Sequence, residues 1–297
     1  MVFDRPLLGI ALMLGFCVLA PLGDSIAKIL GTGFDILHLL VIRFAFQAVI
    51  LVPLLWITGR KIITNARITR ITALRTVLHI IGIGAMFTSL KYLPIADAIA
   101  IAFVMPFILL LLGKYILDEE VGPHRLGAAT VGFAGTLMII QPNFAEVGWP
   151  ALLPLVVAVV FALFMLVTRT IAKEVDAISL QAHSGIMATL VLVPVAVFLG
   201  ATGYSSQVHA PTNGQFLLLL ALGTVGTLSH LLMTWSLRFA PAATLAPMQY
   251  LEIPVATFFG WLIFSDLPNG LAAAGILTTV AAGLYVVWRE RVNAAAP

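Results

Sequence analysis

The chain has 297 residues, of which 61% are hydrophobic and 10% are charged, whereas a soluble domain has about 25% charged residues. This deficit excludes an ordinary soluble enzyme, and a net charge of +3 without a basic, aromatic surface segment excludes a nucleic-acid-binding protein. The uncharged runs are long enough to cross a hydrocarbon core of ~30 Å, so the sequence predicts an all-α polytopic membrane protein.

Short loops that contain Gly, Pro and Asn divide the apolar sequence into ten predicted transmembrane helices. The first apolar run follows Arg5 and is longer than the ~7–15-residue core of a signal peptide, so we expect it to be retained. It contains Cys17, the one cysteine, which excludes an intramolecular disulfide. The predicted spans are residues 6–30, 34–58, 72–90, 94–116, 122–141, 149–170, 176–200, 213–238, 241–264 and 269–289.

Lysine and arginine are distributed unevenly between the two sides of these spans. If the N-terminus is inside, Lys28 and Lys91 fall on the outer side and Arg43 falls within a span, while the other thirteen basic residues fall on the inner side. Cytoplasmic loops near span ends retain such residues, so we expect both termini to be cytoplasmic. The inner group is Arg5, Arg60, Lys61, Arg67, Arg70, Arg75, Lys114, Arg125, Arg169, Lys173, Arg238, Arg289 and Arg291.

An internal repeat divides the chain into two halves. Residues 89–94 (SLKYLP) recur 147 positions later as residues 236–241 (SLRFAP). Each half, 1–142 and 143–297, contains five predicted spans, and because five is odd the second half must enter the membrane from the opposite side. Two inverted five-helix repeats are the architecture of many secondary transporters, which bind substrate near the membrane midplane where the repeats meet.

The repeated pattern is a basic residue, an aromatic residue and a proline before a Pro-containing span, then an acidic residue, Glu119 or Asp266, and a Gly-rich span. It resembles the drug/metabolite transporter superfamily, specifically its ten-helix EamA-like branch, and the resemblance is strongest in residues 91–141 and 238–290. It implies an inner-membrane carrier with a central cavity that works by alternating access. Members carry amino acids, S-adenosylmethionine, riboflavin and purines, so the fold does not choose the substrate. An amino acid or related metabolite is the first expectation, with riboflavin or S-adenosylmethionine as alternatives.

Glu252 leads the candidate substrate-binding or coupling residues. It lies ~16 Å from the start of its span, close to the midplane. Pro247 and Pro254 each remove a backbone donor, so this span should be bent or locally open beside the acid, where Gln249 and Tyr250 also lie. The alternative is a structural carboxyl group that is neutralised by a proton or by hydrogen bonds to neighbouring helices.

A second polar group is predicted nearer the outer face. Asp24 and Lys28 are one helical turn apart, Arg43 and Gln47 form a similar pair in the second span, and Asp97 lies one turn inside the fourth. The charges nearly balance, which favours an ion network that closes the outer end of a cavity. The alternative is that Arg43 binds an anionic substrate group, because its planar fork suits a carboxylate or phosphate.

Histidine and aromatic side chains supply the remaining candidates. His79, His183 and His230 lie in the inner half, and histidine can pass protons near neutral pH, although a lone buried histidine is more often a hydrogen-bonded packing element. Of these, His183 and His230 are the candidate cavity residues. Trp235 and Tyr250 could stack on a flat substrate, or simply pack between helices.

Other classes of function are disfavoured by missing motifs. The sequence has neither the GxxxxGK[ST] loop of an ATP-driven pump nor the HExxH pair of a zinc protease. No filter-like motif points to a channel, and Ala182 replaces the first glycine that a serine-hydrolase elbow would place before Ser184. We therefore predict a secondary active transporter, coupled to protons or to exchange, that binds a small molecule and lipid and needs no cofactor or metal.

The predicted orientation can be tested with two single cysteines, at positions 65 and 269, in a variant that lacks Cys17. Only position 269 should react with an impermeant thiol reagent added to intact cells, because Asn65 lies in a basic inner loop. Modification of position 65 under the same conditions would overturn both the orientation and the inverted repeat.

Overall fold

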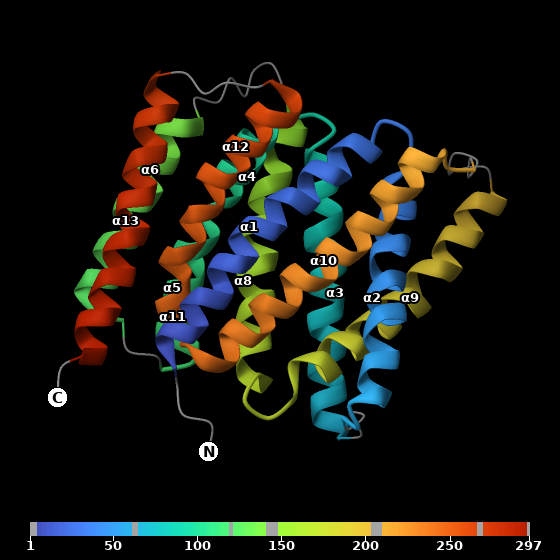
Figure 1. Cartoon of the computed structure of the whole chain (residues 1–297), viewed down its shortest axis with the longest axis horizontal. Helices are drawn as coiled ribbons and strands as arrows, with labels where there is room; N and C mark the ends of the chain where they lie inside the picture. Colours follow the sequence, from blue (N-terminus) through green and yellow to red (C-terminus); the bar gives the residue numbers. More distant parts are fainter. Residues whose placement is uncertain are drawn as a thin grey trace.

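The computed structural model describes residues 5–60, 65–118, 121–140, 148–202, 210–265 and 270–295, and every regular element in these ranges is a helix. The helices lie side by side, and the start of the first and the end of the last lie at the same end of the bundle (Figure 1). The elements are α1 (Pro6–Leu30), α2 (Ile36–Ile57), α3 (Ala66–Ser89), α4 (Ile95–Ala102), α5 (Met105–Ile116), α6 (Pro123–Ile140), the 3-10 helix η1 (Trp149–Leu152), α8 (Leu153–Ile171), α9 (Ala177–Ala201), α10 (Asn213–Phe239), α11 (Ala242–Leu245), the 3-10 helix η2 (Ala246–Leu251), α12 (Glu252–Phe264) and α13 (Gly270–Ala295).

Seven helical segments within the described ranges are long and apolar enough to cross a membrane, and α4 and α5 together count as one of them. This confirms an all-helical polytopic membrane protein. The other predicted spans correspond to α6, to the divided segment α11–η2–α12, and to α13, which contains the shorter apolar stretch Ala273–Val286. The count of ten spans therefore stays a prediction, since division leaves α12 with 13 residues.

Two spans are interrupted at related places. The stretch Ala246–Leu251 is a 3-10 helix that ends directly before Glu252, so the α-helix is interrupted beside this acid, where the two prolines predict a bend or local opening. A second interruption, which the sequence analysis missed, falls at Phe103 between α4 and α5. Phe103 and Tyr250 are 147 positions apart, the offset of the sequence repeat, and their ring centroids are 5.7 Å apart.

The two halves of the chain are interleaved. α1 packs most extensively on α10, α3 on α8, α2 on α9 and α6 on α13, so each of these helices of the first half lies along a helix of the second (Figure 1). Glycines allow close approach: a Cβ at Gly185 would lie 2.9 Å from the backbone nitrogen of Ala48 in α2. A cavity between the halves is therefore lined from both.

The count of inner basic residues misplaces one arginine. Arg75 was assigned to the inner side as a residue near the end of the predicted span 72–90, but α3 begins at Ala66 and Arg75 is completely buried within it. The helix begins early because the Asn65 side chain accepts hydrogen bonds from the backbone N–H groups of Arg67 and Ile68. Three other elements of the sequence predictions, namely the boundary between residues 142 and 143, the acids Glu119 and Asp266, and position 269, lie outside the described residues.

The contact between α6 and α13 can be tested with paired glycine substitutions. A Cβ at Gly135 would lie 2.7 Å from Thr279 Oγ1 and 2.9 Å from the carbonyl oxygen of Gly275, whereas a Cβ at Gly127 of the same helix meets nothing within 4 Å. We expect Gly135→Ala to lower the free energy of unfolding by about 1–3 kcal/mol through overpacking. Gly127→Ala should unfold like the unmodified protein in a thermal assay in detergent. Equal melting temperatures for the two variants would contradict the close approach.

Candidate functional site

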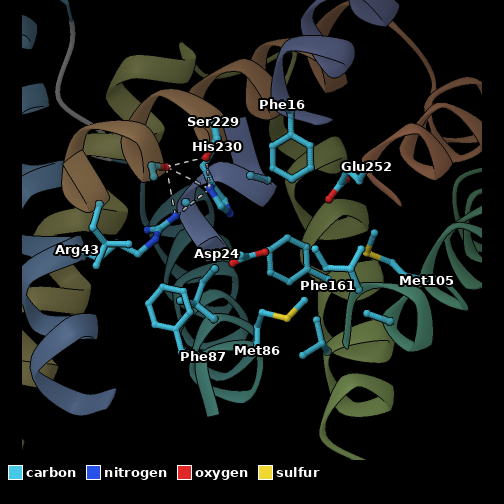
Figure 2. A pocket seen from close by; sticks show the side chains of 18 of the residues that line it. Phe16, Asp24, Arg43, Met86, Phe87, Met105, Phe161, Ser229, His230 and Glu252 are labelled. Carbon is cyan, nitrogen blue, oxygen red and sulfur yellow. Dashed lines mark hydrogen bonds between the residues drawn. The ribbon is translucent and has the colours of Figure 1, made fainter. Parts of the chain in front are cut away.

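A cavity lies where α1, α2, α3, α8 and α10 meet the two interrupted spans, and it is lined from both halves of the chain (Figure 2). Most of its wall is apolar, with polar side chains at a few points, which is the usual composition of a small-molecule site. The aromatic lining residues are Phe16, Phe87, Phe103 and Phe161. The polar lining residues are Asp24, Arg43, Ser229, His230 and Glu252.

Arg43 is the cation of the cavity. It is 2% exposed, and its Nη2 donates to the carbonyl oxygen of Gly226 (3.2 Å) and to His230 Nδ1 (2.8 Å). Its Nη1 is buried and has no hydrogen-bond partner among the described residues. A Cβ at position 226 would lie 2.9 Å from Arg43 Nε, so the missing side chain of Gly226 makes room for the guanidinium. Arg43 therefore keeps one buried donor available for a ligand.

The Nδ1 atom of His230 lies within hydrogen-bond distance of three groups. They are Arg43 Nη2 (2.8 Å), which can only donate, the Gly226 carbonyl oxygen (3.2 Å), which can only accept, and the Ser229 hydroxyl oxygen (3.1 Å), which can do either. The other ring nitrogen, Nε2, is buried and has no partner among the described residues. His230 therefore presents a second buried polar atom to the surroundings of Arg43.

Two carboxyl groups face the same cavity. Glu252 is the first residue of α12, where the N-terminal end of the helix dipole favours an acid, and its buried Oε1 has no partner among the described residues. Asp24 of α1 points into the cavity from the other side of Phe161 (Figure 2) and makes no ion pair in the described part of the chain. The cavity thus combines two acids with one guanidinium and one imidazole, and Arg43, His230 and Glu252 each have a buried polar atom without a partner among the described residues.

Four of the predicted site residues meet at this cavity: Asp24, Arg43, His230 and Glu252. Arg43 directs its hydrogen bonds to α10. Lys28 donates to the carbonyl oxygen of Leu93, and the outer ion network stays a prediction. Ser229 and the phenylalanines of the cavity were missed, because nothing in a helical pattern separates a lining residue from a packing residue.

The other five predicted residues lie away from the cavity wall. Tyr250 is completely buried against Phe103, and Gln249 lies with its Nε2 2.9 Å from the sulfur of Met165. Trp235 packs against an apolar cluster that includes Leu51, and the other two, His183 and Asp97, are partly buried on α9 and α4. Within the described residues no three His, Cys, Asp or Glu side chains gather to hold a metal ion.

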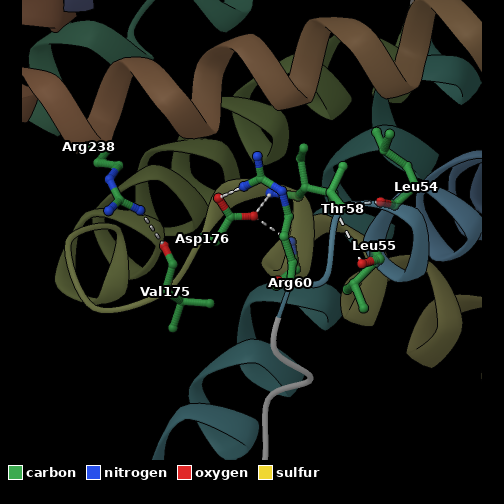
Figure 3. A network of polar contacts seen from close by, with 9 residues as sticks. Leu54, Leu55, Thr58, Arg60, Val175, Asp176 and Arg238 are labelled. Carbon is green, nitrogen blue, oxygen red and sulfur yellow. Dashed lines mark hydrogen bonds and ion pairs between the residues drawn. The ribbon is translucent and has the colours of Figure 1, made fainter.

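Ion pairs join the two halves at the end of the bundle where α2 ends and α3 begins. Arg60 pairs with Asp176 (Figure 3), and Arg67 contacts both carboxylate oxygens of Glu174 (2.8 and 3.1 Å). Within the second half, Arg238 donates a hydrogen bond to the carbonyl oxygen of Val175 (Figure 3). These contacts hold the α8–α9 turn against α2, α3 and α10. The cavity residues of α3, at 83–87, lie toward the opposite end of that helix, so the pairs close the end of the bundle away from the cavity.

The chain is similar over most of its length to known transport proteins. The sequence model of the "EamA-like transporter family" matches twice, over residues 7–141 and 148–288. The S-adenosylmethionine uptake transporter of Rickettsia prowazekii is 24% identical over 95% of this chain and 93% of its own length. The riboflavin transporter of Rhizobium johnstonii is 29% identical over 73% of this chain and 69% of its own. A solved crystal structure with 19% identity has the same fold, with a TM-score of 0.72 over 96% of this chain and 97% of that one.

The shared electrostatics of the cavity can be tested with a double-mutant cycle. Arg43→Gln leaves the two carboxyl groups without a cation in the cavity, so we expect it to lower the stability toward heat. Asp24→Asn in the same chain should recover part of the loss, with a coupling energy of about 0.5–3 kcal/mol. Arg70→Gln, which neutralises an exposed arginine on α3, should be additive with Asp24→Asn. If the stability losses of Arg43→Gln and Asp24→Asn are purely additive, the two side chains do not interact electrostatically.

Proposed function

Because the chain belongs to the EamA-like transporter family, we propose that it is a secondary carrier that moves a small metabolite across the inner membrane by alternating access. The observation that carries this proposal is a cavity lined from both halves, with available polar atoms on Arg43, His230 and Glu252, in a bundle whose other end is closed by ion pairs. The two states of a carrier require such a site and such a closure. Both termini are then cytoplasmic, and the ion pairs form the inner closure.

The two halves of the chain act, in this proposal, as inverted five-helix repeats, 1–142 and 143–297. Three observations support the division. The family model matches twice, and the interruptions of the two spans are 147 positions apart. In addition, if each helix is replaced by its counterpart in the other half, the main helix–helix contacts remain the same set. The contact of α1 with α10 becomes that of α8 with α3, while α2–α9 and α6–α13 map onto themselves. Such a pairing lets one half rock against the other around a shared site.

The substrate class that best fits the cavity is a heteroaromatic nucleoside joined to a charged amino acid, as in S-adenosylmethionine. This molecule carries a sulfonium, an ammonium and a carboxylate, and the cavity offers two carboxyl groups, Asp24 and Glu252, and one guanidinium, Arg43. The phenylalanine rings give the adenine base stacking surfaces. The name of the Rickettsia relative supports this alternative better than the simple amino acid expected first from the sequence.

A flat, uncharged heterocycle such as riboflavin is the second candidate. The mainly apolar, aromatic wall and the name of the Rhizobium relative favour it. Riboflavin, however, leaves two carboxyl groups and a guanidinium in the cavity without ionic partners, which is costly at membrane depth. Competition between the two compounds for uptake would rank them directly. We propose no enzymatic step, since alternating access requires no change in the bonds of the substrate.

Glu252→Gln tests the central role of this carboxyl group in transport. The variant keeps the shape and the hydrogen-bonding capacity of the side chain but cannot hold a negative charge or exchange a proton. We expect it to reach the membrane and to lose most S-adenosylmethionine uptake, or the dependence of that uptake on pH. Thr257→Val is the matched control, because Thr257 is a buried polar residue of the same helix outside the cavity wall. Unchanged uptake and an unchanged pH profile would remove Glu252 from the site.

A further inference from the structure

A second buried arginine lies beyond the wall of the cavity. Arg75 of α3 is completely buried, and no carboxyl group among the described residues contacts it. Its partners are three hydroxyl groups from three other helices, namely Thr168 Oγ1 (2.8 Å), Ser184 Oγ (2.7 Å) and Thr234 Oγ1 (3.3 Å). Hydroxyl groups solvate a guanidinium but do not neutralise it, so Arg75 is a cation buried between helices without a counter-ion in the described chain.

His79 lies one helical turn from Arg75 and shares its surroundings. Both groups lie against the ring of Phe164, with the Arg75 Cζ 4.5 Å and the His79 ring 4.6 Å from its centroid. His79 is completely buried, and neither of its ring nitrogens has a hydrogen-bond partner among the described residues. A fully buried imidazole with two unpartnered nitrogens, beside an unneutralised guanidinium, has the polar atoms needed to bind a ligand.

This second site is continuous with the cavity. The ring of His79 lies 4.3 Å from the ring of His230, centroid to centroid, and His230 receives a hydrogen bond from Arg43. A column of four side chains, Arg43–His230–His79–Arg75, therefore leads from the cavity toward the half of α3 that begins at the closed end of the bundle. Arg43 Nη1, His230 Nε2 and both ring nitrogens of His79 are buried without a partner among the described residues, and no acid of the described chain pairs with any of the four side chains.

We propose that Arg75 and His79 form a second anion subsite, which takes the carboxylate of the substrate from Arg43 when the carrier opens toward the end that is closed in this structure. In this structure the three hydroxyl groups accept hydrogen bonds from the guanidinium of Arg75. Opening that end separates α3 from α8, α9 and α10, which withdraws these hydroxyl groups and leaves the planar fork for a carboxylate. The substrate then exchanges one guanidinium for another and never loses its cationic partner during the crossing.

The subsite rests on the proposed function, and oriented proteoliposomes test it. Arg75→Gln should raise the KM for S-adenosylmethionine presented from the inner side by about tenfold or more, because a charge-assisted hydrogen bond is lost, and should leave the KM from the outer side unchanged. Decarboxylated S-adenosylmethionine should show the same KM in the variant as in the unmodified protein. Arg70→Gln, on the exposed face of the same helix, is the control, and Arg75→Lys retains the charge if the glutamine variant is unstable.

A structural clamp predicts a different outcome. If Arg75 only joins the helices, its substitution lowers the melting temperature and changes transport of both compounds equally from both sides, and that result overturns the subsite. If the unmodified protein carries no S-adenosylmethionine, the proposed substrate fails by itself, and the subsite is judged by labelling with a phenylglyoxal reagent from the inner side. Modification of Arg75 that acetate slows supports the subsite. Modification at a rate independent of acetate, or none, overturns it.

Discussion

The cost of holding ionisable side chains at membrane depth governs the way this bundle is built. Arg43 and Arg75 are buried among apolar helices, and no carboxylate among the described residues neutralises either by contact. The protein solvates them instead with the Gly226 carbonyl group, an imidazole nitrogen and three hydroxyl groups. Because these partners belong to helices of the second half, the solvation of the two arginines also joins the halves across the centre of the molecule.

The two halves share the course of their backbone but differ in the side chains that they present to the cavity. Both contain an interrupted span at the same repeat position, and Phe103 meets Tyr250 there. Directly after each break, however, the first half has Met105 and the second has Glu252, and both line the cavity. A duplicated backbone can supply two equivalent closures for alternating access, while unlike side chains give one cavity with a defined arrangement of charges. The proposed mechanism follows from the duplicated backbone, and the proposed substrate follows from the unlike side chains.

The ion pairs at the closed end are suited to being broken. The side chains of Arg67 and Glu174 are 59% and 44% exposed, and an exposed pair of this kind contributes about 0–1 kcal/mol. A closure made of such contacts holds one state without making the other inaccessible. By contrast, α2 and α9 approach each other closely in the middle of the bundle, since a Cβ added at Gly185 would lie 2.9 Å from the backbone nitrogen of Ala48.

The sequence by itself determined the class of the protein, the repeat, and the interruption beside Glu252, because hydrocarbon penalises charge residue by residue and proline breaks a helix locally. It also selected Arg43, Asp24 and His230, since polar residues inside apolar spans are few. Only the tertiary structure decided which of them meet. Gln249 and Tyr250 are neighbours of Glu252 in sequence and yet lie behind the wall, because the 3-10 turn sends successive side chains in different directions. Arg75 was counted with the basic residues near the inner ends of the spans, and only the structure shows that it is completely buried in α3. Its hydroxyl partners come from positions 93 to 159 residues away along the chain, a distance over which no local pattern carries information.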